Sequence, residues 1–266
     1  MPSTPPFFSV LMPTHQRPAL LRRALQSLRE QACQDFEIVL VADDWDAATA
    51  TAAAELLRPQ DMFLKRSGQP GPAGSRNEAL RLARGEWVVF LDDDDTFLPN
   101  HLLALQAQAR QPDAQVLFTG YEVVTEDRTQ PGAPTLSRQS MALGGLDVQA
   151  LWVRNFIPNH TLAYRRALLQ GLSFDEHLAS LEDWDFLLSV CSRAMPRHWE
   201  GGGVVMHKDY VNPGLRRGNS ESSSNHLVVL DFLHIYRRWP APDAALRAQR
   251  QALLAQVGLN LPMEWF

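Results

Sequence analysis

Four consecutive aspartates, Asp92 to Asp95, are the residues whose types and spacing most clearly suggest chemistry. They follow the run Glu86–Leu91, whose mostly apolar residues predict a buried strand. Four like charges side by side repel one another at neutral pH. A divalent cation is a natural compensator, because Mg²⁺ and Mn²⁺ prefer carboxylate oxygens and also bind phosphate. A solvated turn is the alternative for an acidic run taken alone, but the position at a strand end favours a metal site.

A second acidic pair, Asp43 and Asp44, ends another largely apolar run, Phe36–Ala42. In open α/β sheets, ligands bind beyond the carboxyl ends of the strands. The pair could instead cap a helix that is predicted from Ala47. Two predicted strands that both end in aspartates nevertheless indicate a cleft for a polar ligand and a metal.

A loop rich in glycine and proline, Gly68–Gly74, precedes a helix that we predict to start at Ser75. Ser75 and Glu78 have the spacing of a capping box, and Gly85 is expected to end the helix. The loop could bind phosphate through backbone N–H groups at the helix start, although it matches neither the P-loop nor the dinucleotide-binding fingerprint. Arg76, in the first turn, is a candidate ligand contact, with surface polarity as the alternative.

The elements that position these residues alternate between strands and helices. The first half predicts strands at Phe8–Pro13, Phe36–Ala42, Met62–Lys65 and Glu86–Leu91, with helices from Pro18 and over Ala47–Leu57. This alternation indicates βαβ units, and therefore an α/β fold with a mixed, mainly parallel central sheet flanked by helices. The second half predicts strands at 116–124, 159–164 and 199–207, a polar loop at 125–145, and helices at 183–191, 226–239 and 244–257.

Composition limits the class of protein. The 266 residues suffice for a single domain over 1–266, and a net charge of -5 without a basic tract argues against nucleic acid as a partner. Two isolated cysteines, Cys33 and Cys191, indicate a reducing compartment. No apolar run approaches the roughly 20 residues that cross a bilayer. We therefore expect a cytoplasmic protein without a transmembrane segment, and a peripheral contact with the inner face of a membrane stays compatible with the sequence.

Four motifs stand in a characteristic order along the chain. They are Ser9–Thr14, Phe36–Asp44, Gly71–Asn77 leading to Phe90–Asp95, and Phe174–Glu176 followed by Leu181–Phe186. With these motifs the sequence resembles glycosyltransferase family 2 from about Phe8 to Ser192. The resemblance implies the GT-A fold, which is Rossmann-like. It also implies a nucleotide-sugar-binding half over about 7–118, an acceptor-binding half over about 119–215, and C-terminal helices over about 220–266.

On the donor side, the resemblance implies contacts with a nucleotide-diphosphate sugar and a divalent metal, Mn²⁺ or Mg²⁺. The matching positions are Thr14 along the nucleotide, Asp43 at the base, Arg76 near the base or phosphates, Asp92 near the ribose, Asp93 in the same motif, and Asp94 on the metal. Because four aspartates stand in a row, Asp93 or Asp95 could share the role of Asp94.

On the acceptor side, the resemblance points to Glu182, Asp183 and Trp184. Asp183 matches a general base that takes the proton from the acceptor hydroxyl while its oxygen attacks the anomeric carbon. The metal would stabilise charge on the departing nucleotide diphosphate, and a single displacement would invert the anomeric configuration. Taken alone, Asp183 could be a helix-start residue that the helix dipole stabilises.

Some positions stay open. Trp45 stands where the family often has glycine, and could stack on the base or simply pack. His207 could be a further metal ligand or a structural residue. The remaining candidates are Trp152, Asn159 and His160 on the acceptor side, and Arg216, Arg217 and Asn219 in a loop that could close over the diphosphate or lie in solvent.

The sequence therefore predicts an inverting glycosyltransferase that uses a nucleotide-diphosphate sugar, with a UDP-sugar favoured. A glycan or a lipid-linked precursor in bacterial surface glycan synthesis is the expected acceptor. A nucleotidyltransferase acting on sugar phosphates is one alternative, but that class carries a glycine-rich loop after the first strand, where this chain has Thr14–Arg17. A non-catalytic nucleotide-sugar-binding module is the other, and the intact Asp183 argues against it.

Overall fold

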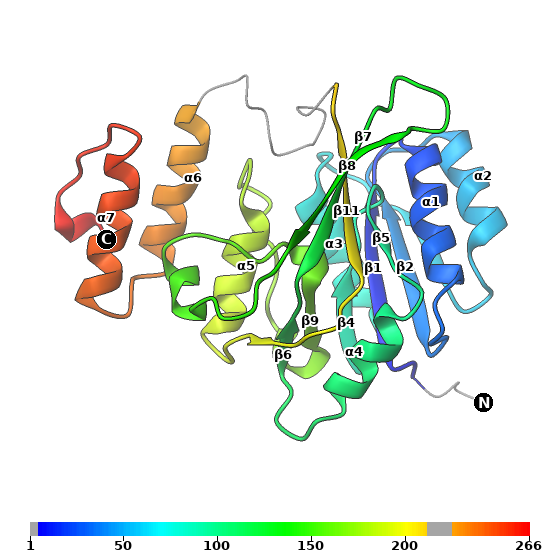
Figure 1. Cartoon of the computed structure of the whole chain (residues 1–266), viewed down its shortest axis with the longest axis horizontal. Helices are drawn as coiled ribbons and strands as arrows, with labels where there is room; N and C mark the ends of the chain where they lie inside the picture. Colours follow the sequence, from blue (N-terminus) through cyan, green and yellow to red (C-terminus); the bar gives the residue numbers. More distant parts are fainter. Residues whose placement is uncertain (1–4, 212–224) are drawn as a thin grey trace.

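The computed structural model describes residues 5–211 and 225–266, and Figure 1 shows how their elements are arranged. The central sheet of the described residues has seven strands in the order β10-β6-β9-β4-β1-β2-β3. These strands are β1 (Phe8–Thr14), β2 (Phe36–Ala42), β3 (Met62–Lys65), β4 (Trp87–Phe90), β6 (Val116–Phe118), β9 (Leu162–Arg165) and β10 (Arg197–His198). Neighbouring strands pair in parallel except around β9, which runs antiparallel to β4 and β6.

Helices cover both faces of this sheet. They are α1 (Pro18–Arg29), α2 (Ala47–Leu56), α3 (Pro72–Leu82), α4 (His101–Ala109) and α5 (Glu182–Cys191). Every residue of β1 and β2 is buried, as expected for parallel strands covered on both sides. Because successive side chains point to opposite faces, Val10 packs with the core that contains α1 and α4, and Leu11 packs with the core that contains α3 and α5. The predicted α/β fold with a mainly parallel sheet is confirmed.

A second sheet lies beside the first, with the order β5-β11-β7-β8. Its strands are β5 (Thr96–Phe97), β7 (Tyr121–Glu126), β8 (Thr135–Met141) and β11 (Val204–Asp209). The prediction of a loop over 125–145 is wrong, because β8 pairs antiparallel with β7. The strand predicted over 116–124 is also wrong as one element, since β6 and β7 belong to different sheets.

Helix α3 begins at Pro72, not at the predicted Ser75. Proline suits the first helical turn, where its missing N–H leaves no bond unmade. The hydroxyl of Ser75 accepts a hydrogen bond from Arg66 Nε at 3.0 Å, so no capping box forms with Glu78. Beyond the helix, Gly85 N donates to Ser9 Oγ at 2.8 Å, and a Cβ at Gly85 would meet the backbone of β1 at 2.5 Å. Glycine is therefore required where the chain leaves α3 and approaches β1.

The C-terminal helices α6 (Asn225–Arg238) and α7 (Ala244–Ala255) lie on the α5 side of the molecule (Figure 1). Asp185 of α5 fixes the end of α6, because its carboxylate accepts from Arg238 Nη1 at 3.0 Å and from Trp239 Nε1 at 2.7 Å. Short 3-10 helices also occur: η1 (Val148–Trp152), η2 (Asn159–Thr161), η3 (Arg166–Leu169) and η5 (Met263–Trp265). Among the described residues, none of the helices has the length and apolar character that a membrane span requires.

Candidate active site

A pocket opens at the carboxyl ends of β1, β2 and β4, where the sequence predicts a ligand. It brings together most of the predicted site residues: Thr14, Asp43, Arg76, Asp92, Asp93, Asp94, Glu182 and Asp183. Asn159 and His160 also line it. In the part of the chain that the structure describes, Trp45, Trp152, Trp184 and His207 are not among its lining residues. Arg216, Arg217 and Asn219 lie outside the described residues.

The buried guanidinium of Arg76 joins the aspartate run after β4 to the acidic pair at the start of α5. Its Nη2 donates to Asp92 Oδ1 at 2.9 Å, and its Nη1 donates to Glu182 Oε1 at 2.7 Å. Burial would raise the pKa of Asp92, but the charge and hydrogen bond of Arg76, together with the charges of His160 and Arg17, outweigh burial and hold that pKa below its ordinary value. Arg76 stays protonated, because the two carboxylates raise its pKa despite burial. One side chain thus fixes the distance between the end of β4 and the start of α5.

Asp93 ties the ends of two strands together. It is fully buried, and its Oδ2 accepts from Thr14 Oγ1 at 2.7 Å while its Oδ1 meets Arg17. Burial, followed by the charge of Asp94, raises the pKa of Asp93 to about 7 against the effect of Arg17. This hydrogen bond between Thr14 and Asp93 holds the end of β1 against the residues that follow β4. Arg17, which the sequence argument missed, also holds Asp94 Oδ2 at 3.1 Å.

The residues best placed for a divalent cation are Asp92, Asp95 and His160, each with one ligand atom within 4.8 Å of the others. His160 Nδ1 lies 3.1 Å from Asp95 Oδ2. Two carboxylates and an imidazole suit Mn²⁺, which accepts nitrogen as well as oxygen ligands. The predicted ligand Asp94 lies beside this group in sequence, but the group does not include it. The donor set therefore fits the implied metal, with a different membership from the one predicted.

His207 stands in a different environment from the predicted metal site. Its Nδ1 contacts Glu126 Oε1 at 2.7 Å and its Nε2 contacts Thr96 Oγ1 at 2.9 Å. Burial and the nearby charge of Arg23 lower its pKa. Both ring nitrogens thus contact residues of the second sheet. The role of His207 as a metal ligand stays a prediction.

Asp183 lies in the first turn of α5, and Leu181, with a left-handed φ of 61°, turns the chain into that helix. Burial, followed by the negative charge of Glu182, raises the pKa of Asp183 to about 6, while Arg76 opposes the rise. Its Oδ1 accepts from the backbone N–H of Trp184 at 2.7 Å. A partly buried carboxylate whose pKa lies near neutrality is suited to accept a proton.

Trp184 does not line the pocket, although the preceding residue, Asp183, does. It is fully buried, and its indole N–H donates to Leu151 O at 2.8 Å. Its ring packs against Tyr236 of α6 with centroids 5.9 Å apart. The structure therefore places Trp184 in the core behind α5, and not on the acceptor side of the pocket.

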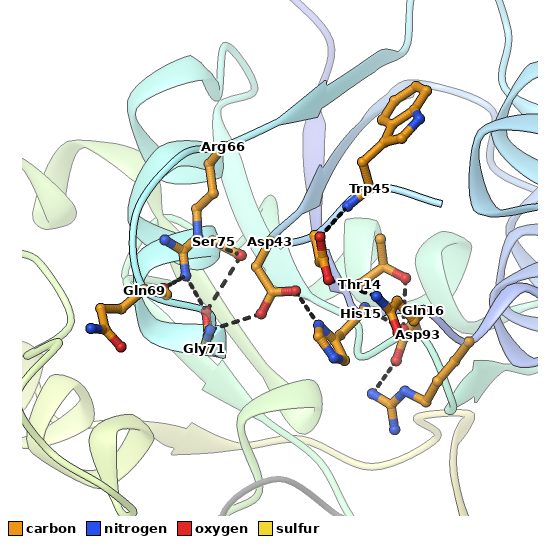
Figure 2. Close-up of polar contacts among 12 residues, drawn as sticks. Thr14, His15, Gln16, Asp43, Trp45, Arg66, Gln69, Gly71, Ser75 and Asp93 are labelled. Atoms are coloured by element: carbon orange, nitrogen blue, oxygen red, sulfur yellow. Dashed lines mark hydrogen bonds and ion pairs between the residues drawn. The ribbon is translucent and has the colours of Figure 1, made fainter. Parts of the chain in front are cut away.

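Figure 2 shows Asp43, which also lines the pocket, between two partners. Asp43 Oδ2 accepts from Gly71 N at 2.7 Å, and its Oδ1 lies 2.5 Å from His15 Nδ1. Arg66 fixes the loop before α3 by donating to Gln69 O at 2.6 Å and Gly71 O at 2.9 Å (Figure 2). His15 and Arg66 were missed in the sequence, where neither stands in a recognisable motif.

Trp45 lies outside this contact network. Its side chain is 52% exposed, and its ring stacks on Phe63 with centroids 6.0 Å apart and an interplanar angle of 20°. Its backbone N–H donates to Asp44 Oδ1 at 2.7 Å. The structure therefore provides a packing partner for Trp45, and a contact of Trp45 with the base stays a prediction.

The pocket with its paired acidic motifs can now be compared with known proteins. The model of the family described as glycosyl transferase family 2 matches residues 9–172. The chain belongs to glycosyl transferase family 2.

Two relatives illustrate this membership of the glycosyltransferases. The putative colanic acid biosynthesis glycosyl transferase WcaA of Escherichia coli (strain K12) is 27% identical over 239 residues, which are 88% of this chain and 81% of that protein. GalNAc(5)-diNAcBac-PP-undecaprenol beta-1,3-glucosyltransferase of Campylobacter jejuni is 36% identical over 114 residues, 42% of this chain. The match spans only 37% of that second relative, well under two thirds of its length.

A solved structure agrees with the fold. S. aureus TarS 1-349, in complex with UDP-GlcNAc, superposes with a TM-score of 0.65 at 22% sequence identity, over 93% of this chain and 71% of that chain. At this identity the likeness shows the fold alone, which is the GT-A-type arrangement that the sequence predicted. This family-2 member is therefore a glycosyltransferase with a GT-A-type fold.

Proposed function

We propose that this glycosyltransferase transfers a sugar from a nucleotide-diphosphate donor to an acceptor hydroxyl with inversion. The observation that carries the proposal is the bridge through Arg76, which holds Asp92 of the donor motif and Glu182 of the acceptor motif in one pocket. Asp183 lines that pocket beside Glu182, with its pKa raised by burial to about 6. Donor and base are then positioned by one buried side chain.

In the proposed reaction, Asp183 accepts the proton of the acceptor hydroxyl as its oxygen attacks the anomeric carbon. The bond from that carbon to the diphosphate oxygen breaks, and its electron pair leaves with the nucleoside diphosphate. With a pKa of about 6, Asp183 is largely ionised at neutral pH and is a stronger base than an ordinary carboxylate. Attack from the face opposite the leaving group inverts the anomeric configuration.

Asp92, Asp95 and His160 are the residues that would hold a divalent cation, Mn²⁺ or Mg²⁺. When bound, such an ion neutralises charge that develops on the leaving diphosphate. Asp43, which also lines the pocket, is proposed to contact the nucleobase, and His15 and Gly71 already orient its carboxylate. Thr14 is proposed to lie along the nucleotide through its place at the end of β1.

The donor and acceptor are proposed from the relatives. TarS is described as a complex with UDP-GlcNAc, which favours a UDP-sugar here. WcaA is named for colanic acid biosynthesis and the Campylobacter jejuni protein for an undecaprenol-linked substrate. We infer a glycan or lipid-linked acceptor in bacterial surface glycan synthesis, reached from the cytoplasm, with a peripheral contact at the inner face of the membrane.

The test is nucleotide binding followed by turnover. Thermal shift with UDP, GDP, dTDP and CDP, each with and without Mn²⁺, should give a metal-dependent rise for one nucleotide. At 100 times its Kd, a ligand stabilises by about 2.7 kcal/mol. The sugar form of that nucleotide should then release nucleoside diphosphate when an acceptor is added. Binding without release would favour a non-catalytic module, and release of pyrophosphate from a sugar phosphate and a nucleoside triphosphate would favour a nucleotidyltransferase.

A further inference from the structure

The side chain of Asn159 is buried in the wall of the pocket, and its amide group makes no hydrogen bond to the described residues. Asn159 is 6% exposed and lines the pocket together with His160 and Asp183. Neither its Nδ2 nor its Oδ1 has a hydrogen-bond partner among the described residues. A buried amide that makes no hydrogen bond is unfavourable, and native proteins rarely keep one without a water or a ligand to satisfy it.

The backbone around Asn159 is held by hydrogen bonds, which fix the point from which its side chain enters the pocket wall. Its carbonyl accepts from the N–H of Leu162 at the end of η2, and Thr161 N donates to Pro158 O at 2.9 Å. Thr119 N donates to Thr161 O at 3.3 Å and ties η2 to the sheet. Because this backbone is already ordered, binding a ligand costs the segment less conformational entropy.

The neighbours of Asn159 indicate which part of a substrate it meets. His160, the next residue, belongs to the group that fits a cation, and Asp183 supplies the base on the same pocket. Asp43, the residue proposed to contact the nucleobase, follows β2 and contacts Gly71 before α3, so it comes from other elements than Asn159. In the proposed donor, the attacked anomeric carbon belongs to the sugar ring, so the ring lies between the diphosphate, which the cation neutralises, and the acceptor, which Asp183 deprotonates. An amide, with a donor and an acceptor in one plane, matches neighbouring hydroxyls of such a ring.

We propose that Asn159 reads the donor sugar: its amide hydrogen bonds to hydroxyl groups of the glycosyl unit and sets which sugar the enzyme accepts. This assignment rests on the proposed function. A site built to bond a hydroxyl discriminates strongly against an analogue that lacks it, because the polar groups of the site are then left unpaired. Asn159 is thus a specificity-determining residue. Its role is separate from that of the general base Asp183 and from the nucleobase contact of Asp43.

The test compares Asn159→Ala with wild type in calorimetric titrations with Mn²⁺. The probes are UDP and UDP-glucose, UDP-galactose and UDP-N-acetylglucosamine, with GDP and GDP-mannose as the second set. We expect the Kd of the nucleoside diphosphate to stay within about twofold, and the Kd of the preferred sugar nucleotide to rise about tenfold or more. Asn159→Asp, which keeps the acceptors but loses both N–H donors, should change the ranking of the sugars.

Asn77 provides a matched control for folding. It is as buried as Asn159, at 7% exposed, but its Nδ2 donates to Phe174 O at 3.0 Å and its Oδ1 accepts from Phe174 N at 2.8 Å. Asn77→Ala should lower Tm, since it breaks these bonds. Asn159→Ala should leave the Tm of the free protein unchanged or raise it, because no bond is lost. A lowered Tm for Asn159→Ala would assign it a structural role and overturn the proposal.

The outcomes separate this assignment from the proposed function. If wild type binds no nucleoside diphosphate, the proposed function fails and takes this assignment with it. If wild type binds both ligands and Asn159→Ala weakens neither, or weakens both equally, only the assignment of Asn159 fails. If donor binding is unchanged and only the KM for the acceptor rises, Asn159 reads the acceptor, and the assignment to the donor sugar is overturned.

Discussion

Replacing Arg76 by methionine should destabilise the fold and raise the pH at which Asp183 ionises, because one guanidinium neutralises two carboxylates. Removing one partner of a buried ion pair typically costs about 3–5 kcal/mol. The side chain of Glu182 is 15% exposed and that of Asp92 is 33% exposed, so water screens part of the repulsion that remains. We therefore expect a loss of about 2–3 kcal/mol in the free energy of unfolding, or roughly 4–12 °C in Tm.

The same variant should move the pH dependence of transfer. Arg76 lowers the pKa of Asp183, against the burial and the Glu182 charge that raise it to about 6. Without Arg76, the carboxyl should stay protonated to higher pH, so the acidic limb of kcat/KM should shift upward by about one pH unit. The assay is release of nucleoside diphosphate across a pH series, and nucleotide binding at each pH confirms that the site is intact.

Arg81→Met on the same helix is the control. Arg81 pairs with Glu78 at the exposed surface of α3, and such pairs contribute only about 0–1 kcal/mol. It should change Tm little and leave the pH profile in place. Two results together would refute the proposed coupling of Asp92 and Glu182 through Arg76. These are an acidic limb that does not move in Arg76→Met and a loss in Tm no larger than in Arg81→Met.

The remaining predictions concern the base and the metal. In wild type, transfer should rise with pH through about 6 and level off above it, because Asp183 acts only when ionised and burial, with the Glu182 charge, raises its pKa to that value. A rate that falls with pH over this interval would contradict the base assignment. His160→Ala should raise the Mn²⁺ concentration for half-maximal activity by about tenfold or more. His207→Ala should lower Tm and leave the Mn²⁺ requirement unchanged, since its ring bonds to Glu126 and Thr96, and the reverse pattern would restore His207 as the ligand.

The elements of the first half could be predicted because parallel strands that are buried on both faces leave nearly continuous apolar runs. The predicted Phe36–Ala42 coincides with β2 for this reason. The strand β8 could not be predicted, since it is an edge strand with mostly exposed side chains and lacks apolar alternation. The start of α3 was misplaced because Ser75, which looked like a cap, is bonded by Arg66 from nine residues earlier.

The motifs of the site could be predicted from the sequence, but the side-chain contacts between these motifs could not. Aspartates at strand ends and Glu182–Asp183 stand out because each follows a recognisable element boundary. The contact between Arg76 and Glu182 joins residues 106 positions apart, which only the fold determines. The inclusion of His160 in the cation group likewise depends on the contact of η2 with Asp95, and no sequence motif indicates that contact.

The most direct test of the central claim is the comparison of Asp183→Asn with wild type for donor binding and for transfer. Asparagine keeps the shape of the side chain and cannot accept the proton at neutral pH. We predict nearly unchanged binding of the donor with Mn²⁺ and a loss of transfer of about 10²–10⁴-fold, the usual contribution of a positioned general base. Transfer at close to the wild-type rate by Asp183→Asn would contradict the account.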